Sequence, residues 1–329
     1  MCRDRTFRCQ GVRGSQEFGW VLAVPRVVIV GDHNSGKTTF LGLLYAAQVK
    51  FGSDKADGFR FHAAFESLDE ISGVFQRLMS GSFPDAATKE GVREIAFRLS
   101  YRRTGLGILS RRRLRGSSPD ASAPFQLILL KSFEADMARS RDEGSVAHGT
   151  LSSALTSDAI VIMVDASSLA VADEEGELAP LGKYDEAVEA LLMAIKRSRD
   201  QAEGKLLYPI FVFSKFDRVD PEVLRRANLN PAPPDVSKKG PHAEYAKRLV
   251  DRSVPKTVAA IRSGGRRGLQ FATPSYFFSW VRSDEPVPGR DQRIRLRRSG
   301  AVGWEPDYPS DEYLAFLECL GRIAADTTA

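Results

Sequence analysis

Strand-sized apolar runs alternate with stretches of helical periodicity along most of the chain. The first run, residues 27–30, reads Val-Val-Ile-Val, a β-branched segment of the kind that becomes a buried parallel strand. Stretches with apolar residues three and four positions apart predict amphipathic helices. The expected strands cover 27–30, 92–101, 125–133, 159–165, 208–213 and 276–281, and the expected helices cover 37–50, 66–79, 146–156, 184–199, 242–261 and 311–324.

This alternation predicts an α/β fold, in which a mostly parallel sheet is covered by helices on both faces. Only strands 92–101 and 125–133 are expected to form a hairpin. At 329 residues, the chain is long for one such domain and short for two, so one domain with insertions is the better prediction. We expect a tail at 1–24 and a single domain at 25–329, with insertions at 52–90, 102–124 and 283–309.

Composition narrows the class of protein. Hydrophobic residues make up 43% of the chain, which allows a sizeable core, and the longest apolar runs have the length of strands. The N-terminus lacks an apolar signal core, and three cysteines are too few for a disulfide framework. These features predict a soluble, cytoplasmic protein with no membrane span.

The positive charge is concentrated rather than spread. The net charge is +5, and two arginine-rich stretches, 111–115 and 293–298, hold most of the surplus. Either stretch could meet nucleic acid or anionic lipid. Neither is interleaved with aromatic residues that would stack on bases, and charge runs in loops are usually solvated. We therefore expect no nucleic-acid partner, and a polyanion partner stays the alternative.

The most specific pattern is a strand that runs directly into Gly31-x-x-x-x-Gly36-Lys37-Thr38 and then into a helix. Successive backbone N–H groups of such a loop surround phosphate oxygens, and the two glycines allow backbone angles that a Cβ would forbid. The positive end of the helix dipole adds to the attraction. This pattern predicts a phosphate-binding loop of the P-loop NTPase type.

Two side chains of the loop have expected roles. The Lys37 ammonium should reach the β- and γ-phosphates, and the Thr38 hydroxyl should hold a Mg²⁺ ion that bridges the same oxygens. The ligand is therefore expected to be a nucleoside triphosphate with magnesium. The expected phosphate-side residues are Gly31, Asp32, His33, Asn34, Ser35, Gly36, Lys37, Thr38 and Thr39.

A second motif, Ser214-Lys215-Phe216-Asp217, follows the strand 208–213. Together with the phosphate loop, it resembles the translation-factor and Ras-like (TRAFAC) class of P-loop GTPases, whose [Asn/Thr]-Lys-x-Asp motif specifies guanine. The resemblance implies a Ras-like fold with insertions, a base-reading carboxylate at Asp217 and a Lys215 stem packed over the base. It also places Ser279 in the turn that supports the base, although Trp280 replaces the alanine of that turn.

Thr88 lies in Gly-x-Phe-Pro-x-x-x-Thr and resembles the switch threonine that ligates Mg²⁺ and senses the γ-phosphate. With Lys37, it is the expected catalytic residue. The phosphate loop, an inserted helix and this Gly-x-Phe-Pro segment together resemble double-GTPase-type proteins of bacterial conflict systems. Asn34 matches the Gly-x-x-Asn-x-Gly-Lys pattern of GTPases that use K⁺ in place of an arginine finger. His33 either crowds the attacking water or points to solvent.

One departure from the family bears on turnover. After the strand 125–133, the family has Asp-x-x-Gly, whose Asp organises the Mg²⁺ shell and whose glycine N–H contacts the γ-phosphate. Here Glu134 and Asp136 are the nearby acids, and neither is followed by a glycine three residues later. Asp165, at the end of another buried strand, is the alternative acid, in the manner of an ATPase.

Three functions therefore stay open. The first is a slow GTPase that acts as a nucleotide-dependent switch for an unknown protein partner, with self-association as a further possibility. The second is a nucleotide-binding scaffold with little or no hydrolysis. The third is a P-loop ATPase that uses Asp165. The sequence favours the first, because the Lys215-x-Asp217 motif follows the expected strand order.

Overall fold

The computed structural model describes residues 25–51, 59–63, 65–84, 94–102, 120–130, 154–172, 178–199, 206–263, 269–285, 291–299 and 303–327. The expected tail at 1–24, most of the helix expected at 146–156 and the first arginine-rich stretch lie outside these residues. The elements are β1 (Arg26–Gly31), α1 (Lys37–Phe51), β2 (Phe59–Ala63), α2 (Phe65–Met79), β3 (Glu94–Arg102), β4 (Asp120–Leu129), β5 (Ala159–Asp165), η2 (Ala166–Ser168), α5 (Gly182–Arg199), β6 (Leu206–Ser214), η3 (Phe216–Arg218), α6 (Pro221–Arg226), α7 (Lys239–Ser253), α8 (Pro255–Arg262), β7 (Gln270–Phe271), β8 (Ser275–Phe278), β9 (Leu296–Ser299), β10 (Gly303–Pro306) and α9 (Ser310–Thr327).

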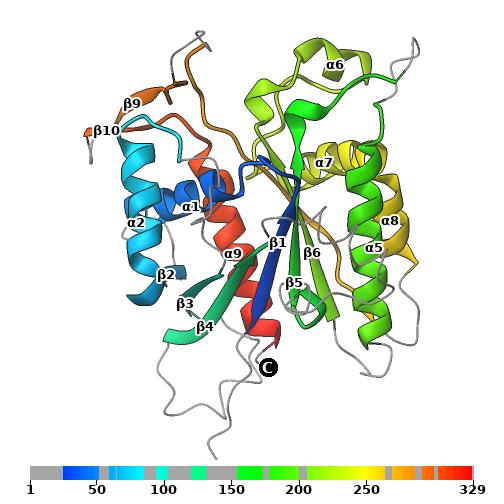
Figure 1. Cartoon of the computed structure of the whole chain (residues 1–329), viewed down its shortest axis with the longest axis horizontal. Helices are drawn as coiled ribbons and strands as arrows, with labels where there is room; N and C mark the ends of the chain where they lie inside the picture. The colour runs from blue at the N-terminus through cyan, green and yellow to red at the C-terminus, as the bar shows by residue number, and fades with distance from the viewer. Residues whose placement is uncertain are drawn as a thin grey trace, which may run out of the picture.

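The central element is an eight-stranded sheet with the order β2-β3-β4-β1-β5-β6-β7, in which β8 also pairs with β6 (Figure 1). Strand β1 pairs in parallel with β4 and β5, and the parallel pairing continues through β6 to β7 and β8. Among the described strands of this sheet, only the pairs β2–β3 and β3–β4 are antiparallel. The predicted α/β fold with a mostly parallel sheet is therefore confirmed.

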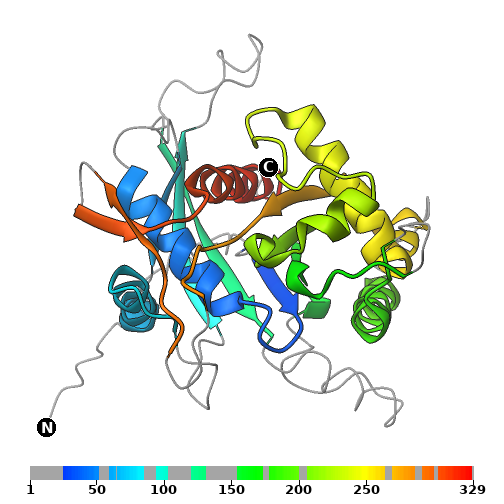
Figure 2. The same cartoon turned by 90° about the horizontal axis from the view of Figure 1, so that it is seen from above.

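The central strands are buried on both faces, which explains why their sequences are apolar without alternation. In β1, Val28 and Val30 join the cluster packed under α5, α7 and α8, whereas Val27 and Ile29 join the cluster packed under α1, α2 and α9. All four side chains are fully buried. Figures 1 and 2 show the two groups of helices on opposite sides of the sheet. Helices therefore cover both faces, as the sequence predicted.

Two local predictions were wrong. Residues 59–63 form strand β2, which pairs antiparallel with β3 at the sheet edge, where a loop was expected. The helix expected at 242–261 is two helices, α7 and α8, because Pro255 stands at the first turn of α8 and Val254 is not helical. Proline lacks the N–H that would continue α7, and it is tolerated at a helix start.

The segment 283–309, which the sequence predicted as an insertion, contains the antiparallel pair β9–β10. It is tied to the end of α2, because the Ile294 N–H donates to the Gly81 carbonyl at 2.8 Å and Ser82 forms a bridge with Arg293. Gly81 adopts φ +82°, and a Cβ there would lie 3.3 Å from the Ile294 oxygen. This insertion therefore packs on α2 rather than standing apart from the domain.

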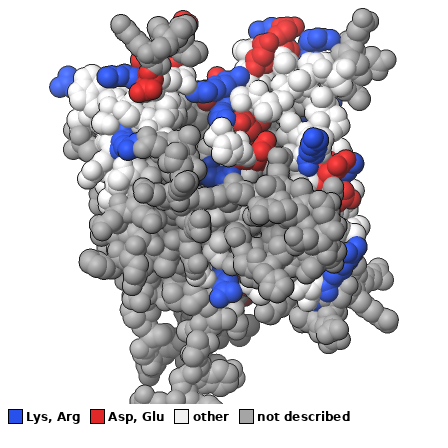
Figure 3. Space-filling model, in the orientation of Figure 1, with Lys and Arg blue, Asp and Glu red and all other residues white. Residues whose placement is uncertain are grey.

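The second arginine-rich stretch is engaged in this insertion. Arg295 pairs with Asp284 at 3.3 Å, and Arg297 pairs with Glu305 at 2.8 Å. In the face shown in Figure 3, Lys and Arg side chains stand beside Asp and Glu rather than in a patch of one sign. These ion pairs give Arg295 and Arg297 a structural role, so their presence in the sequence is explained without a polyanion partner.

None of the helices in the described ranges is both long and apolar enough to cross a membrane.

Helix α9 satisfies the outer edge of β8. The Glu312 carboxylate accepts the Phe278 N–H at 3.1 Å through one oxygen and lies 2.9 Å from His242 Nε2 through the other. The Glu312 and His242 side chains are 7% and 5% exposed. One buried carboxylate therefore joins α9, α7 and β8, directly behind the end of the strand.

We predict that Glu312→Ala lowers the free energy of unfolding by about 1 to 3 kcal/mol, because it leaves a buried N–H without an acceptor. Glu312→Gln retains an oxygen for Phe278 and should lose less. Urea denaturation of the full chain measures both, with Glu318→Ala on the exposed side of α9 as the control. An unchanged midpoint for Glu312→Ala would contradict this account of the edge.

Candidate functional site

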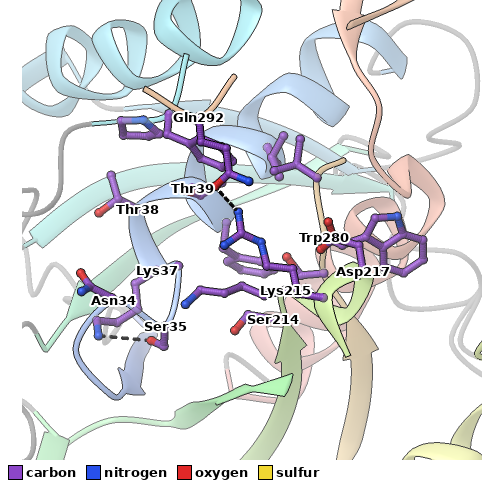
Figure 4. A pocket seen from close by; sticks show the side chains of 18 of the residues that line it. Asn34, Ser35, Lys37, Thr38, Thr39, Ser214, Lys215, Asp217, Trp280 and Gln292 are labelled. Carbon is purple, nitrogen blue, oxygen red and sulfur yellow. Dashed lines mark hydrogen bonds between the residues drawn. The ribbon is translucent and has the colours of Figure 1, made fainter. Parts of the chain in front are cut away.

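The carboxyl ends of β1, β6 and β8 meet at one edge of the sheet, because parallel pairing sets Gly31 beside Met163 and Phe213 beside Phe278. A cavity of about 450 Å³ opens there (Figure 4). This volume lies within the range of small-molecule pockets, roughly 300 to 1,000 Å³. Its walls include the predicted residues 33–39, Lys215, Asp217 and Ser279.

The loop after β1 has the backbone that its glycines require. Gly36 has φ +84° and Asn34 has φ +62°, both in the left-handed region. A Cβ on Gly31 would lie 2.6 Å from Ser35 Oγ and 3.0 Å from Met163 Cβ, so the loop closes against a bare backbone. The Ser35 N–H donates to the Asp32 carbonyl at 3.1 Å, which closes the turn. Left-handed residues in such a turn direct successive backbone N–H groups toward one side, which is the geometry of anion-binding loops.

Lys37 is folded back along the loop. Its Nζ donates to the carbonyls of Gly31 at 2.7 Å and Asp32 at 2.8 Å, and it lies 3.4 Å from Ser35 Oγ. The side chain is almost fully buried. These contacts hold the ammonium beside the loop. Because a lysine side chain is flexible and has three N–H donors, the ammonium could move from there to phosphate oxygens.

Helix α1 begins at Lys37, and the Phe40 N–H donates to the Gly36 carbonyl at 2.8 Å as the first helical bond. The half-buried Thr38 and Thr39 lie in this first turn and line the cavity. The helix N-terminus, with its N–H groups that lack intrahelical acceptors, therefore faces the cavity beside the loop.

The second predicted motif lies on the opposite wall of the cavity. Lys215 has φ +50°, and its Nζ pairs with Asp165 Oδ2 at 2.6 Å. Ser214 is buried, and its hydroxyl donates to the Val164 carbonyl at 3.2 Å. Figure 4 shows the Lys215 side chain running from Ser214 toward the phosphate loop. The serine in place of the family's Asn or Thr thus ties β6 to β5.

Asp217 lies in η3 with part of its surface open to solvent. Desolvation by the surrounding protein raises the pKa of its carboxyl, and the charges of Arg218 and Arg282 act in the opposite direction. Apart from its own backbone N–H, the carboxylate makes no side-chain hydrogen bond or salt bridge within the part of the chain that the structure describes. Because Asp217 is exposed, its oxygens are open to hydrogen-bond donors of a ligand in the cavity.

Ser279 fixes the two loops of this wall to each other. Its carbonyl accepts the Phe216 N–H at 3.3 Å, and its hydroxyl lies 2.7 Å from the Tyr313 hydroxyl of α9. Burial and packing raise the pKa of Tyr313, which stays a neutral phenol. Ser279 and Asp217 therefore line the same cavity, and the predicted support of a base by Ser279 stays a prediction.

Several lining residues were not predicted. Arg218, Gln292 and Trp280 line the cavity, as do Phe83 and Pro84 at the start of the segment that leads to Thr88. Trp280 was noted only as a departure from the family turn, and Gln292 lies in an insertion. For Arg218, its position directly after Asp217 in the sequence was a signal that could have predicted a place in the cavity wall.

Other predicted residues are not placed in the cavity wall. Gly31 and Asp32 lie just behind it and contribute carbonyls to Lys37. Thr88, Glu134 and Asp136 fall outside the described residues. Asp165 does not line the cavity, and its carboxylate binds Lys215 and the Ser167 hydroxyl, the latter at 2.6 Å. Within the described ranges, no group of three or more His, Cys, Asp or Glu residues could hold a metal.

No known protein-family model matches the chain, and a search of curated proteins finds no match either.

We predict that Lys37→Ala weakens triphosphate binding by about 1.5 to 3 kcal/mol, because it removes a charged donor to phosphate oxygens. The fold should be retained, because the strand pairings of β1 and the buried apolar clusters do not include the Lys37 side chain. Calorimetric titration with Mg²⁺ and GTP measures the loss, with exposed Lys247→Ala as the control. Wild-type affinity in Lys37→Ala would show that the loop does not bind phosphate.

Proposed function

We propose that this chain binds a guanine nucleoside triphosphate with Mg²⁺ and acts as a slow GTPase switch. The observation that supports this most is convergence. The phosphate loop and Lys215-Phe216-Asp217 are far apart in sequence, yet they line one cavity of suitable size. Chance motifs in unrelated turns would have no reason to line the same cavity.

The charges of the cavity fit a polyanion at one end. Lys37, the loop amides and the α1 N-terminus gather on the side of residues 33–39. The Thr38 hydroxyl stands in the same turn, where it would ligate Mg²⁺ together with phosphate oxygens and water, since Mg²⁺ usually retains several waters and few protein ligands. A triphosphate with its metal is the ligand that uses all of these groups.

The other end of the cavity fits guanine. An ionised Asp217 accepts hydrogen bonds only, and guanine presents a ring N–H and an exocyclic amine on one edge, whereas adenine does not. The Asp217 carboxylate lines the cavity and would accept both of these hydrogen bonds from the base. The ATPase alternative is less well supported, because Asp165 is paired with Lys215 and lies outside the cavity wall.

The strand order also supports a Ras-like arrangement. Strand β1 lies between β4 and β5, so the strands that follow it along the chain are placed first on one side of it and then on the other. Ligands of α/β sheets bind at the point where the strand order reverses in this way. Along the chain, β6 and β8 follow β5 outward from β1 and end at the two base-side loops. The proposed base site therefore lies at the carboxyl ends of β6 and β8.

The switch function is inferred from two features of the sequence: it has the expected magnesium ligands, and it lacks a motif that GTPases use in hydrolysis. Thr38 and the proposed switch residue Thr88 would serve the magnesium shell, but the strand 125–133 is not followed by the Asp-x-x-Gly whose glycine would contact the γ-phosphate. Slow hydrolysis would leave the triphosphate state long-lived until a protein partner or self-association accelerates turnover. If turnover is absent altogether, the same cavity makes the chain a nucleotide-binding scaffold.

We predict that Asp217→Asn weakens GTP binding and improves binding of xanthosine triphosphate, since an amide donates to the oxygen that xanthine has where guanine has its amine. Competition titrations of GTP, xanthosine triphosphate and ATP against both proteins measure the exchange of preference. Asp326→Asn, at the far end of α9, is the control. An unchanged preference in Asp217→Asn would contradict the base assignment.

We predict that intrinsic GTP hydrolysis is slow, at or below roughly 10⁻³ per second, the order of an unassisted small GTPase. Asn34, which lies at the cavity mouth with φ +62°, is the proposed K⁺ contact, so acceleration in potassium over sodium should be lost in Asn34→Ala. Single-turnover assays over a range of protein concentrations measure this. Fast turnover in sodium at every concentration would contradict the proposal.

A further inference from the structure

An arginine in the cavity is held from the opposite wall by the 283–309 insertion. Arg218 ends η3, directly after Asp217, and its Nη2 donates to Gln292 Oε1 at 2.7 Å. Both residues line the cavity. Figure 4 shows Gln292 on the side of the pocket away from Ser214 and Lys215, with the hydrogen bond reaching across toward that wall. The contact therefore links η3 to the 283–309 insertion at the cavity.

The Gln292 amide has a fixed orientation. Its Nε2 donates to Ser283 Oγ at 2.8 Å and to the Asp284 carbonyl at 3.1 Å. An amide has two N–H donors and one oxygen, so with both donors used on the insertion the oxygen is left for Arg218. Backbone bonds, such as the Asp284 N–H to the Arg293 carbonyl at 2.8 Å, hold the segment itself.

The charge of Arg218 is not cancelled by this partner, because Gln292 is neutral. Among the described residues Arg218 forms no salt bridge, whereas Lys215 pairs with Asp165 and Lys37 contacts loop carbonyls. A guanidinium has five N–H donors in a rigid plane, and one of them is used here. The remaining donors and the planar face are therefore available to a ligand in the cavity.

We propose that Arg218 contacts the nucleoside part of the ligand and that Gln292 is the residue that positions it. The proposal rests on the proposed nucleotide binding. Arg218 lies next to Asp217, the base-reading residue, and not on the phosphate loop, so the contact is to base and sugar rather than to the β- and γ-phosphates. A guanidinium plane suits this place, because it stacks on aromatic bases and donates to sugar oxygens.

The test compares GDP with inorganic triphosphate, a probe without base or sugar, on the full chain with Mg²⁺. Arg218→Ala should weaken GDP binding by about 10- to 100-fold, the loss of a charge-assisted contact, and leave triphosphate binding unchanged. Arg218→Lys keeps the charge but loses the plane and should not restore GDP binding. Exposed Arg298→Ala in the same insertion is the control and should match wild type.

A double-mutant cycle tests the positioning role of Gln292. Gln292→Ala should weaken GDP binding several-fold in the wild-type background and have no further effect in Arg218→Ala. An equal loss in both backgrounds would overturn the positioning role, since it would show a purely structural effect. Wild-type GDP affinity in Arg218→Ala, restored affinity in Arg218→Lys, or an equal loss of triphosphate binding would overturn the nucleoside contact.

The two levels of the proposal fail in different ways. A wild-type chain that binds neither GDP nor triphosphate would overturn the proposed function, and this inference with it. A wild-type chain that binds GDP, with variants that bind it equally well, would overturn only the role of Arg218.

Discussion

Parallel pairing of the central strands is the constraint on which the site depends. Because β1, β5, β6 and β8 run in one direction, their carboxyl ends lie at one edge of the sheet. Burial of both faces by helices leaves that edge as the place where polar loops can gather. Residues 31–38 and Ser214–Asp217 are thereby brought together, although most of the sheet lies between them in the sequence.

The loops at that edge are joined by specific hydrogen bonds. Ser279 holds the loop after β6 through the Phe216 N–H, Tyr313 holds Ser279, and Glu312 holds the end of β8 from the same helix. On the other side, the insertion joins Arg218 through Gln292 and the end of α2 through Ile294. The proposed base site is thus supported by α9 behind it and by the insertion in front, two elements from the C-terminal part of the chain.

The sequence predicted what depends on local pattern and missed what depends on tertiary contact. The buried strands and the phosphate loop were found because fully apolar runs and the Gly31-to-Thr38 spacing have local causes. Strand β2 was missed because a five-residue edge strand has a weak pattern, and the break at Pro255 was missed because apolar periodicity continues across it. Gln292 could not be found, since its role exists only where the insertion meets Arg218.

The central claim is that one cavity binds phosphates at residues 33–39 and guanine at Asp217. Its most direct test is an equilibrium titration of the purified full chain, with Mg²⁺, against GTP, GDP, ATP and ADP in parallel. We predict saturable binding of both guanine nucleotides at one site per chain, and much weaker binding of both adenine nucleotides. Equal or stronger binding of ATP, or no binding of any of the four, would contradict the claim.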